Sequence, residues 1–360
     1  MKKYLPGLLF LAMILTATVG SVASRFYETW DWQQKFKGEK VMPDDWTWGA
    51  DILPGFESRF VKMDNAFDGP VRCTIIRKLA PQKSRKAFLY VHGFNDYFFQ
   101  TEMGQRMVDS GYNFYAVDLR RYGRSRLPWQ YPFNVRKMDE YFEDIDSALN
   151  QIRRDGNTDI TLGGHSTGGL TVCYFAAMRG RRTGVNRVVT DSPFLEWNFS
   201  PFMRNVVAPM IGGLSPLSPN GKIKQGHCDG YAYSLLKQYD GEWEYNTDWK
   251  MIYSPPVTMS WVGAINKAQS QTMKHKDWIV VPLLVMTSSR AINGCNYTPE
   301  FSTGDCVLNP HDIRRRGEQL GIDSLRMVCE IDSGLHDLIL SRKSVRDKAY
   351  DTMFRFMRTY

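Results

Sequence analysis

Cysteine and histidine are both scarce in this chain, with six residues of each among 360. So few cysteines exclude a small disulfide-built scaffold, because such folds need a much higher cysteine density to replace a core. The mean hydropathy is negative, which excludes a protein with many membrane spans. What remains is an ordinary globular composition, 43% hydrophobic and 23% charged, in a chain long enough to bury a sizeable core.

A strong excess of charge of one sign is also missing. Lys plus Arg outnumber Asp plus Glu by 46 to 38, a formal net charge of +8. The two basic runs of the chain, residues 179–182 and 314–316, fall on or beside predicted helices, where solvated helix faces explain them. We therefore expect no nucleic-acid partner.

The N-terminal segment has the pattern of an export signal. Two lysines at positions 2 and 3 precede an apolar run over residues 4–19, and small residues follow up to Ala23. This pattern predicts a signal peptide over residues 1–23 with cleavage near Ala23, and hence a periplasmic or secreted protein. The alternative is an uncleaved membrane anchor over residues 4–23.

Export would permit disulfides, because the destination is oxidising. Cys295 and Cys306 are the pair that the sequence favours, since both lie in a stretch rich in Gly, Asn and Thr that is unlike regular structure. Cys228 has no assigned partner. Three further cysteines sit inside apolar patterns and are expected to be buried free thiols: Cys73, Cys173 and Cys329.

Short β-prone runs alternate with helical patterns over residues 84–191 and again after residue 277, which is typical of a parallel sheet with crossover helices. The stretch between them is rich in Pro, Gly and aromatic residues and predicts an inserted, mainly helical cap over residues 194–276. We therefore predict an α/β fold with a mostly parallel central sheet flanked by helices. Its core would comprise residues 24–193 and 277–360.

The most informative segment is Gly-Gly-His-Ser-Thr-Gly-Gly at residues 163–169, between a predicted strand and a predicted helix. In that context G-x-S-x-G indicates a sharp turn that exposes the hydroxyl of Ser166 at the carboxyl edge of the sheet. Gly164 and Gly168 fit the turn because a side chain there would collide across it. The segment predicts a serine nucleophile, with a phosphate-binding helix start or a plain tight turn as the alternatives.

A serine nucleophile needs a base and an acid, and in this type of site they follow it along the chain in the order acid, then histidine. Two of the six histidines precede Ser166, two lie in the predicted cap and one begins a helix, which leaves His336 directly after the last predicted strand. Asp305 is the preferred acid, because its irregular stretch has no structural need of a carboxylate. Asp312, at a helix start where capping explains an acid, and Glu300 remain alternatives.

In this order, the motifs resemble the α/β-hydrolase superfamily, specifically the serine hydrolases that include monoacylglycerol lipases, lysophospholipases and S33-type aminopeptidases. Besides the serine turn, the resemblance rests on the His-Gly segment 90–97, the turn 118–125, and the surroundings of the predicted acid and histidine. It implies that the backbone N–H groups of Phe94 and Thr167 form an oxyanion hole, and that His92 fixes its loop. Arg121 departs from the family pattern, which usually has Gly in that position.

The resemblance implies hydrolysis through an acyl-enzyme on Ser166, with His336 as general base and acid, Asp305 orienting it, and neither cofactor nor metal. The aromatic and Met content of the cap favours a carboxylic ester with a hydrophobic acyl group, such as a monoacylglycerol or lysophospholipid, as the small-molecule substrate. Contact with a membrane surface is compatible with such a substrate. The oligomeric state is not predicted.

Two other functions stay open at the level of sequence. An aminopeptidase would use the same triad and would need carboxylates to hold the free amine of its substrate, a role that Glu196, Glu242 or Glu244 could take. The remaining alternative is a non-catalytic ligand-binding protein built on the hydrolase fold.

Overall fold

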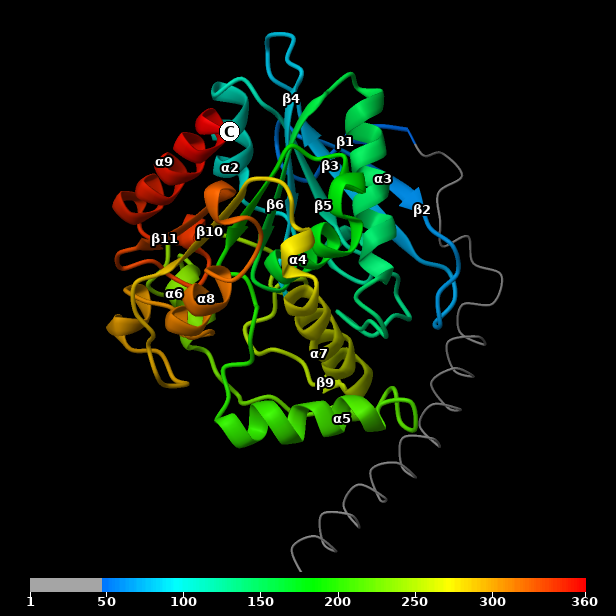
Figure 1. Ribbon diagram of the computed structural model, residues 1–360, viewed down its shortest axis with the longest axis vertical. Helices are drawn as coiled ribbons and strands as arrows, with labels where there is room; N and C mark the ends of the chain where they lie inside the picture. The colour runs from blue at the N-terminus through cyan, green and yellow to red at the C-terminus, as the bar shows by residue number, and fades with distance from the viewer. Residues whose placement is uncertain (1–46) are drawn as a thin grey trace, which may run out of the picture.

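The computed structural model describes residues 47–360, so the predicted signal segment lies outside the described residues. Its centre is a nine-stranded sheet of order β1-β2-β3-β5-β4-β6-β7-β10-β11 (Figure 1). The strands are β1 (Gly49–Ala50), β2 (Glu57–Lys62), β3 (Arg72–Lys78), β4 (Lys86–Val91), β5 (Asn113–Asp118), β6 (Asp159–His165), β7 (Arg187–Asp191), β10 (Leu283–Ser288) and β11 (Arg326–Ile331).

The six strands from β5 to β11 in this order run parallel, and β1 to β3 form an antiparallel edge. The predicted α/β fold with a mostly parallel sheet is therefore confirmed. Parallel pairing places the carboxyl ends of the central strands at one edge, and a ligand site is expected at that edge.

Helices cover both faces of the sheet, because its central strands are apolar on both sides. In β4, Ala87, Leu89 and Val91 belong to one buried cluster, whereas Phe88 and Tyr90 belong to the cluster on the opposite face. The first cluster is completed by α3 (Glu140–Arg154), α4 (Thr167–Arg179) and α8 (Pro310–Gly317), and the second by α2 (Thr101–Asp109) and α9 (Lys343–Thr359). Each fully buried apolar side chain contributes about 1.5–3 kcal/mol to folding.

Helix α3 shows how the sequence specifies these elements. Tyr141, Ile145, Leu149 and Ile152 recur at helical spacing and are all buried against the sheet. Its first turn carries acids and its last turn carries arginines, which suits the helix dipole. The helical pattern in the sequence runs over residues 138–154, so the helix begins two residues after the start of its pattern and ends with it.

The segment between β7 and β10 adds no strand to the nine-stranded sheet. It contains α5 (Ala208–Leu214), α6 (Gly230–Leu235), α7 (Met259–Lys274) and a two-stranded ribbon of β8 (Lys222–Ile223) and β9 (Val257–Thr258). Helix α7 packs against both α4 and α5, and α5 runs across the bottom of the molecule in Figure 1. The segment thus stands over the carboxyl edge of the sheet while α7 joins it to the core.

The predicted disulfide is wrong: Cys295 is bonded to Cys228, and Cys306 is a free thiol. The chain around Cys228 lies directly against the chain around Cys295, since the N–H of Gly230 donates to the carbonyl of Cys295 over 3.0 Å. The N–H of Tyr297 also donates to the Asp229 carboxylate over 2.9 Å. The irregular stretch that Cys295 and Cys306 share favoured that pair, whereas the bond that forms joins residues 67 positions apart.

Within residues 47–360, none of the helices combines the length and the apolar character that crossing a membrane would require.

Candidate active site

Ser166 occupies the single residue between β6 and α4. Its backbone has φ 52° and ψ −117°. Residues that carry a side chain rarely adopt such a positive φ, so the turn is strained. A Cβ on Gly164 would lie 2.6 Å from the carbonyl oxygen of Gly168, and a Cβ on Gly168 would lie 2.3 Å from the carbonyl oxygens of Val91 and His92. Only glycine fits at these two positions, because the backbone approaches itself within the turn at Gly164 and approaches the end of β4 at Gly168.

Ser166, His336 and Asp305 form one hydrogen-bonded row. His336 Nε2 lies 2.8 Å from Ser166 Oγ, and His336 Nδ1 lies 2.9 Å from Asp305 Oδ2. The three side chains come from loops after β6, β10 and β11, so residues separated by up to 170 positions meet at the carboxyl edge of the sheet. All three are buried, Asp305 completely.

The Asp305 carboxylate is held from the opposite side. Its Oδ1 accepts hydrogen bonds from the backbone N–H groups of Val307 and Leu308, each over 2.8 Å. Its own N–H donates to the carbonyl of Arg290 over 3.0 Å, which fixes the long loop beside the end of β10. Asp312 lies elsewhere: its carboxylate is paired with Arg315 over 3.1 Å at the start of α8.

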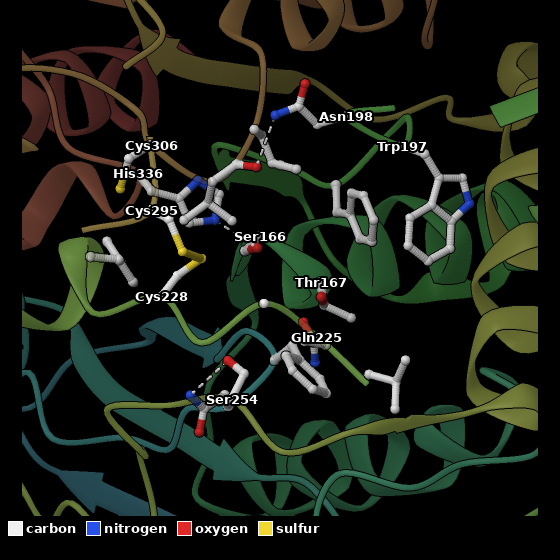
Figure 2. Close-up of a pocket in the computed structure, with 18 of the residues that line it drawn as sticks. Ser166, Thr167, Trp197, Asn198, Gln225, Cys228, Ser254, Cys295, Cys306 and His336 are labelled. Carbon is white, nitrogen blue, oxygen red and sulfur yellow. Dashed lines mark hydrogen bonds between the residues drawn. A yellow bond between two sulfur atoms is a disulfide. The ribbon is translucent and has the colours of Figure 1, made fainter. Parts of the chain in front are cut away.

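The loop after β4 brings a second element to the nucleophile. A Cβ on Gly93 would lie 3.1 Å from Ser166 Cβ, so the backbone passes very close to the serine there. Phe94 and Thr167, the two residues implied as oxyanion-hole donors, both line the cavity around Ser166. Among the described residues, neither backbone N–H is engaged in a hydrogen bond to another backbone group. Figure 2 shows Thr167 beside Ser166 at the start of α4.

His92 fixes this loop and does not contact the serine hydroxyl. Its Nε2 accepts a hydrogen bond from the N–H of Leu119 over 3.1 Å, which leaves Nδ1 to donate to the carbonyl of Gly93 over 2.8 Å. Both ring nitrogens are therefore occupied, in the neutral tautomer. The ring also packs on Tyr122, with centroids 4.7 Å apart.

The turn after β5 supports the same loop. The Asp118 carboxylate accepts hydrogen bonds from the N–H of Phe98 over 2.9 Å and from the N–H of Arg124 over 3.0 Å. Arg121, which stands where the resembled family usually has Gly, has φ 69° and is completely buried. Its guanidinium is paired with Asp68 and Glu140, so these ion pairs hold an arginine in a backbone conformation that favours glycine.

A cavity of about 580 Å³ opens in front of Ser166, between the inserted segment and the core. Figure 2 shows Ser166 and His336 on one side of it with the Cys228–Cys295 disulfide, and Trp197 across from them. Most of its wall is apolar, and the aromatic residues that line it are Phe94, Phe194, Trp197, Phe199, Tyr231, Tyr245, Trp261 and Phe301.

Behind the row lies a buried charged cluster that the sequence analysis did not identify. It comprises Asp96, His165, Asp191, Lys250 and Asp337, all nearly inaccessible to solvent. The ammonium of Lys250 is 3.0 Å from Asp96 Oδ1. The signal in the sequence was weak, because two of these residues merely flank Ser166 and His336 and the others come from three separate segments.

A serine on a strand-to-helix turn, hydrogen-bonded to a histidine and an aspartate over a mostly parallel sheet, defines a protein of the α/β-hydrolase type. The family model described as "serine aminopeptidase, S33" matches residues 82–291, more than half of the chain. The chain therefore belongs to this family of the α/β-hydrolase superfamily. No curated protein matches the chain.

Solved structures agree on the fold. A monoacylglycerol lipase from Paleococcus ferrophilus has 18% identity and a TM-score of 0.58, covering 79% of this chain and 99% of its own. A soluble variant of the monoglyceride lipase from Saccharomyces cerevisiae, bound to a substrate analogue, has 14% identity and a TM-score of 0.55, covering 90% and 99%. A thermophilic esterase from Thermogutta terrifontis has 15% identity and a TM-score of 0.52, covering 83% and 99%.

Proposed function

We propose that this protein is a serine hydrolase that cleaves carboxylic esters with a hydrophobic acyl group through an acyl-enzyme on Ser166. The observation that carries the proposal is the hydrogen-bonded row of Ser166, His336 and Asp305, which ends with the serine hydroxyl in a large apolar cavity. A serine hydroxyl becomes a useful nucleophile only when a neighbouring base takes its proton.

In the proposed reaction, His336 Nε2 removes the proton from Ser166 as the oxygen attacks the ester carbonyl. The negative charge that develops on the carbonyl oxygen would be met by the N–H groups of Phe94 and Thr167, each worth about 3 kcal/mol in the transition state. His336 then gives its proton to the departing alkoxide, and water repeats the sequence to release the acid. Asp305 keeps the imidazole in the tautomer that this requires and stabilises the imidazolium that forms.

The wall of the cavity supports an apolar acyl group. Beyond Ser166 it is lined by Phe194, Trp197, Met203 and Ile211, which offer an acyl chain burial at about 25 cal/mol per Å² of apolar surface. The lining also includes polar side chains, among them Asn95 and Ser254, which are hydrogen-bonded to each other over 3.3 Å. These side chains could accommodate a more polar alcohol part of the substrate.

The lining also favours an ester over an aminoacyl amide. None of the described residues that line the cavity carries a carboxylate, whereas two lysines, Lys224 and Lys250, do line it. Glu196 is bound by arginines of α8 and the inserted segment, Glu242 pairs with Arg346, and Glu244 is exposed beside a lysine. A free α-amine would therefore have no carboxylate counter-charge in this cavity. The family is named for aminopeptidases, whereas the structural neighbours include lipases and an esterase.

We also propose that the protein is exported, from the signal pattern over residues 1–23. The Cys228–Cys295 disulfide supports this, because such bonds persist in oxidising compartments. Mass spectrometry of the N-terminus of the mature protein would identify the cleavage site, and an intact N-terminus in the membrane fraction would instead favour the anchor.

The proposed reaction is tested by labelling the purified protein with a fluorophosphonate probe, with Ser166→Ala as the comparison, and by assaying an ester series of increasing acyl length beside aminoacyl amides. We expect labelling that depends on Ser166 and turnover of esters only. Ser125→Ala, which changes another buried serine far from His336 in the chain, is the matched control for labelling. Labelling of Ser166→Ala would contradict the assignment of the nucleophile, and turnover confined to amides would favour a peptidase.

A further inference from the structure

Asp191, at the end of β7, is hydrogen-bonded to both halves of the candidate active site. Its backbone carbonyl accepts a hydrogen bond from the N–H of Ser166 over 2.9 Å. Its side-chain Oδ2 accepts one from the N–H of Leu338 over 3.0 Å, two residues beyond His336. One residue thus holds the serine turn and the histidine loop in their relative positions.

The side chain of Asp191 lies against a second buried carboxyl group, that of Asp337, which is completely inaccessible to solvent. Among the described residues, no donor meets strict hydrogen-bond geometry at Asp191 Oδ1 or at either oxygen of Asp337, although the side chain of Ser192 approaches Asp191 and that of Gln100 approaches Asp337. The two carboxyl groups are within hydrogen-bonding reach of each other. Two ionised carboxylates cannot form that bond, because neither has a hydrogen to donate.

The charged groups around the pair do not supply enough positive charge to balance two ionised carboxylates. The titratable groups that face it from neighbouring elements are Tyr90, Asp96, His165, Tyr231, Lys250, His336 and Tyr350. The only lysine among them is paired with Asp96, and although it also acts on Asp337, burial still raises the pKa of Asp337. Burial, together with the neighbouring His336, lowers the pKa of His165 well below its usual range, so His165 is neutral and 3.9 Å from the nearest oxygen of either carboxyl.

We propose that Asp191 is a positioning residue for the triad, and that it holds the serine turn against the histidine loop through one proton shared with Asp337. The expected effect on kcat rests on the proposed hydrolase function, whereas the shared proton does not depend on that function. Burial and the neighbouring Asp337 carboxylate raise the pKa of Asp191 well above its ordinary value, the direction that a proton shared by the pair requires.

A bound cation is the competing way to neutralise the cluster. Donor atoms of Asp96, His165 and Asp337 lie within 4.8 Å of one another. The ammonium of Lys250 already contacts one of these carboxylates, which disfavours a second cation beside it. The experiment therefore includes a chelator.

The shared proton is tested by the melting temperature as a function of pH. An acid whose pKa is raised on folding makes the native state bind a proton that the unfolded state has lost, so stability falls as pH rises from about 4 towards the raised pKa. We expect Asp191→Asn, which is isosteric with the protonated acid, to lose most of this fall. Asp332→Asn, an exposed acid of the same histidine loop, should keep the wild-type fall.

An Asp191→Asn protein with the wild-type pH dependence of melting would overturn the shared proton. So would a wild-type melting temperature that drops on treatment with EDTA and recovers with Mg²⁺, Mn²⁺ or Zn²⁺, because a cation would then neutralise the cluster.

The positioning role is tested by ester hydrolysis per active site, with fluorophosphonate titration counting the active sites. We expect Asp191→Ala to lower kcat by about a hundredfold with little change in KM, since a small displacement of a catalytic group has that effect. Asp191→Asn should restore kcat to within about threefold at neutral pH and extend activity on the alkaline side. A lower melting temperature with unchanged kcat per titrated site would show a merely structural role and overturn the proposal.

If Asp191→Ala does not fold, the comparison of Asp191→Asn with wild type across the alkaline limb decides the question alone, and identical limbs overturn the proposal. If no ester is turned over by the wild type, the proposed function fails, whereas the melting experiment still tests the shared proton.

Discussion

At the scale of single residues, backbone conformation and hydrogen-bonding capacity decide what each position contributes. Ser166 is strained at φ 52°, and the neighbouring glycines make room for that strain. In the sequence, the irregular stretch around Asp305 showed no structural need of a carboxylate. In the structure it is shaped so that the two N–H groups at positions 307 and 308 hold one carboxylate oxygen and leave the other for His336.

The choice between the two candidate acids gives a prediction at this scale. Asp305→Asn should lower kcat by about 10⁴-fold, because an amide cannot accept the Nδ1–H of His336 in the same way and no longer stabilises the imidazolium. Asp312→Asn, whose carboxylate pairs with Arg315 at the surface of α8, should change kcat by less than about threefold. Steady-state ester hydrolysis with matched melting temperatures measures both, and the reverse order would return the role to Asp312.

Arg121 is held in a positive-φ backbone conformation by ion pairs that the motif did not predict. The resembled family places Gly where φ is positive, and this chain holds a buried arginine there by pairing it with Asp68 and Glu140. Breaking a buried ion pair by removing one partner typically costs about 3–5 kcal/mol. The departure at Arg121 therefore concerns stability of the turn and leaves the arrangement at Ser166 intact.

At the scale of elements, the segment between β7 and β10 is attached to the core by α7 and by the Cys228–Cys295 disulfide. Helix α7 begins with a side-chain cap, in which Thr258 accepts the N–H of Trp261 over 3.1 Å, and then packs on α4. The disulfide joins the loop after β8 to the loop after β10, and Cys295 and Cys228 both line the cavity. The bond thus fixes one wall of the cavity.

Removal of this disulfide gives a prediction at the element scale. Closing a loop of 67 residues restricts the unfolded chain enough to contribute about 4 kcal/mol to stability, so Cys228→Ser together with Cys295→Ser should lower the free energy of unfolding by about that amount. Urea denaturation measures the change. Cys306→Ser is the control and should leave the free energy of unfolding within about 1 kcal/mol, because Cys306 is a free thiol. Equal effects of both changes would mean that the bond is not formed.

At the scale of the whole molecule, the cavity exists only because the inserted segment stands over the carboxyl edge of the sheet. Ser166 and His336 belong to the core, whereas Ala208, Met203 and Trp261 belong to the inserted segment. Neither part encloses an acyl chain alone. The preference for acyl length is therefore a property of how the two parts are spaced.

Filling the cavity from the inserted segment should shorten the preferred acyl chain. Ala208 lines the cavity from α5, and Ala208→Phe should lower kcat/KM for long-chain esters by about tenfold or more while leaving a short-chain ester within about threefold. Val206→Phe places the same ring on the exposed face two residues earlier, outside the cavity lining, and should not change the preference. A p-nitrophenyl ester series measures the profile, and a uniform loss at every chain length would contradict this placement.

The sequence by itself determined the fold class and the most informative positions of the site. Strand and helix periodicities come from local burial patterns, and the serine turn is a local motif whose glycines are required by close backbone contacts within and beside the turn. The scarcity of histidine then pointed to His336 by elimination. These features can be predicted from the sequence because each depends on spacing within a few residues or on the order of elements along the chain.

Only the tertiary structure decided the partner of Cys295, the geometry of Asp305 and the buried cluster around Asp191. Cys228 is brought to Cys295 by the folding of the inserted segment, not by nearness in sequence. Asp191 and Asp337 are ordinary acids in the sequence, and their proximity arises because the loop after β11 reaches past β10 to the end of β7, where the N–H of Leu338 donates to Asp191. Pairing between distant segments and the desolvation of charged groups depend on the complete three-dimensional packing, which no local pattern encodes.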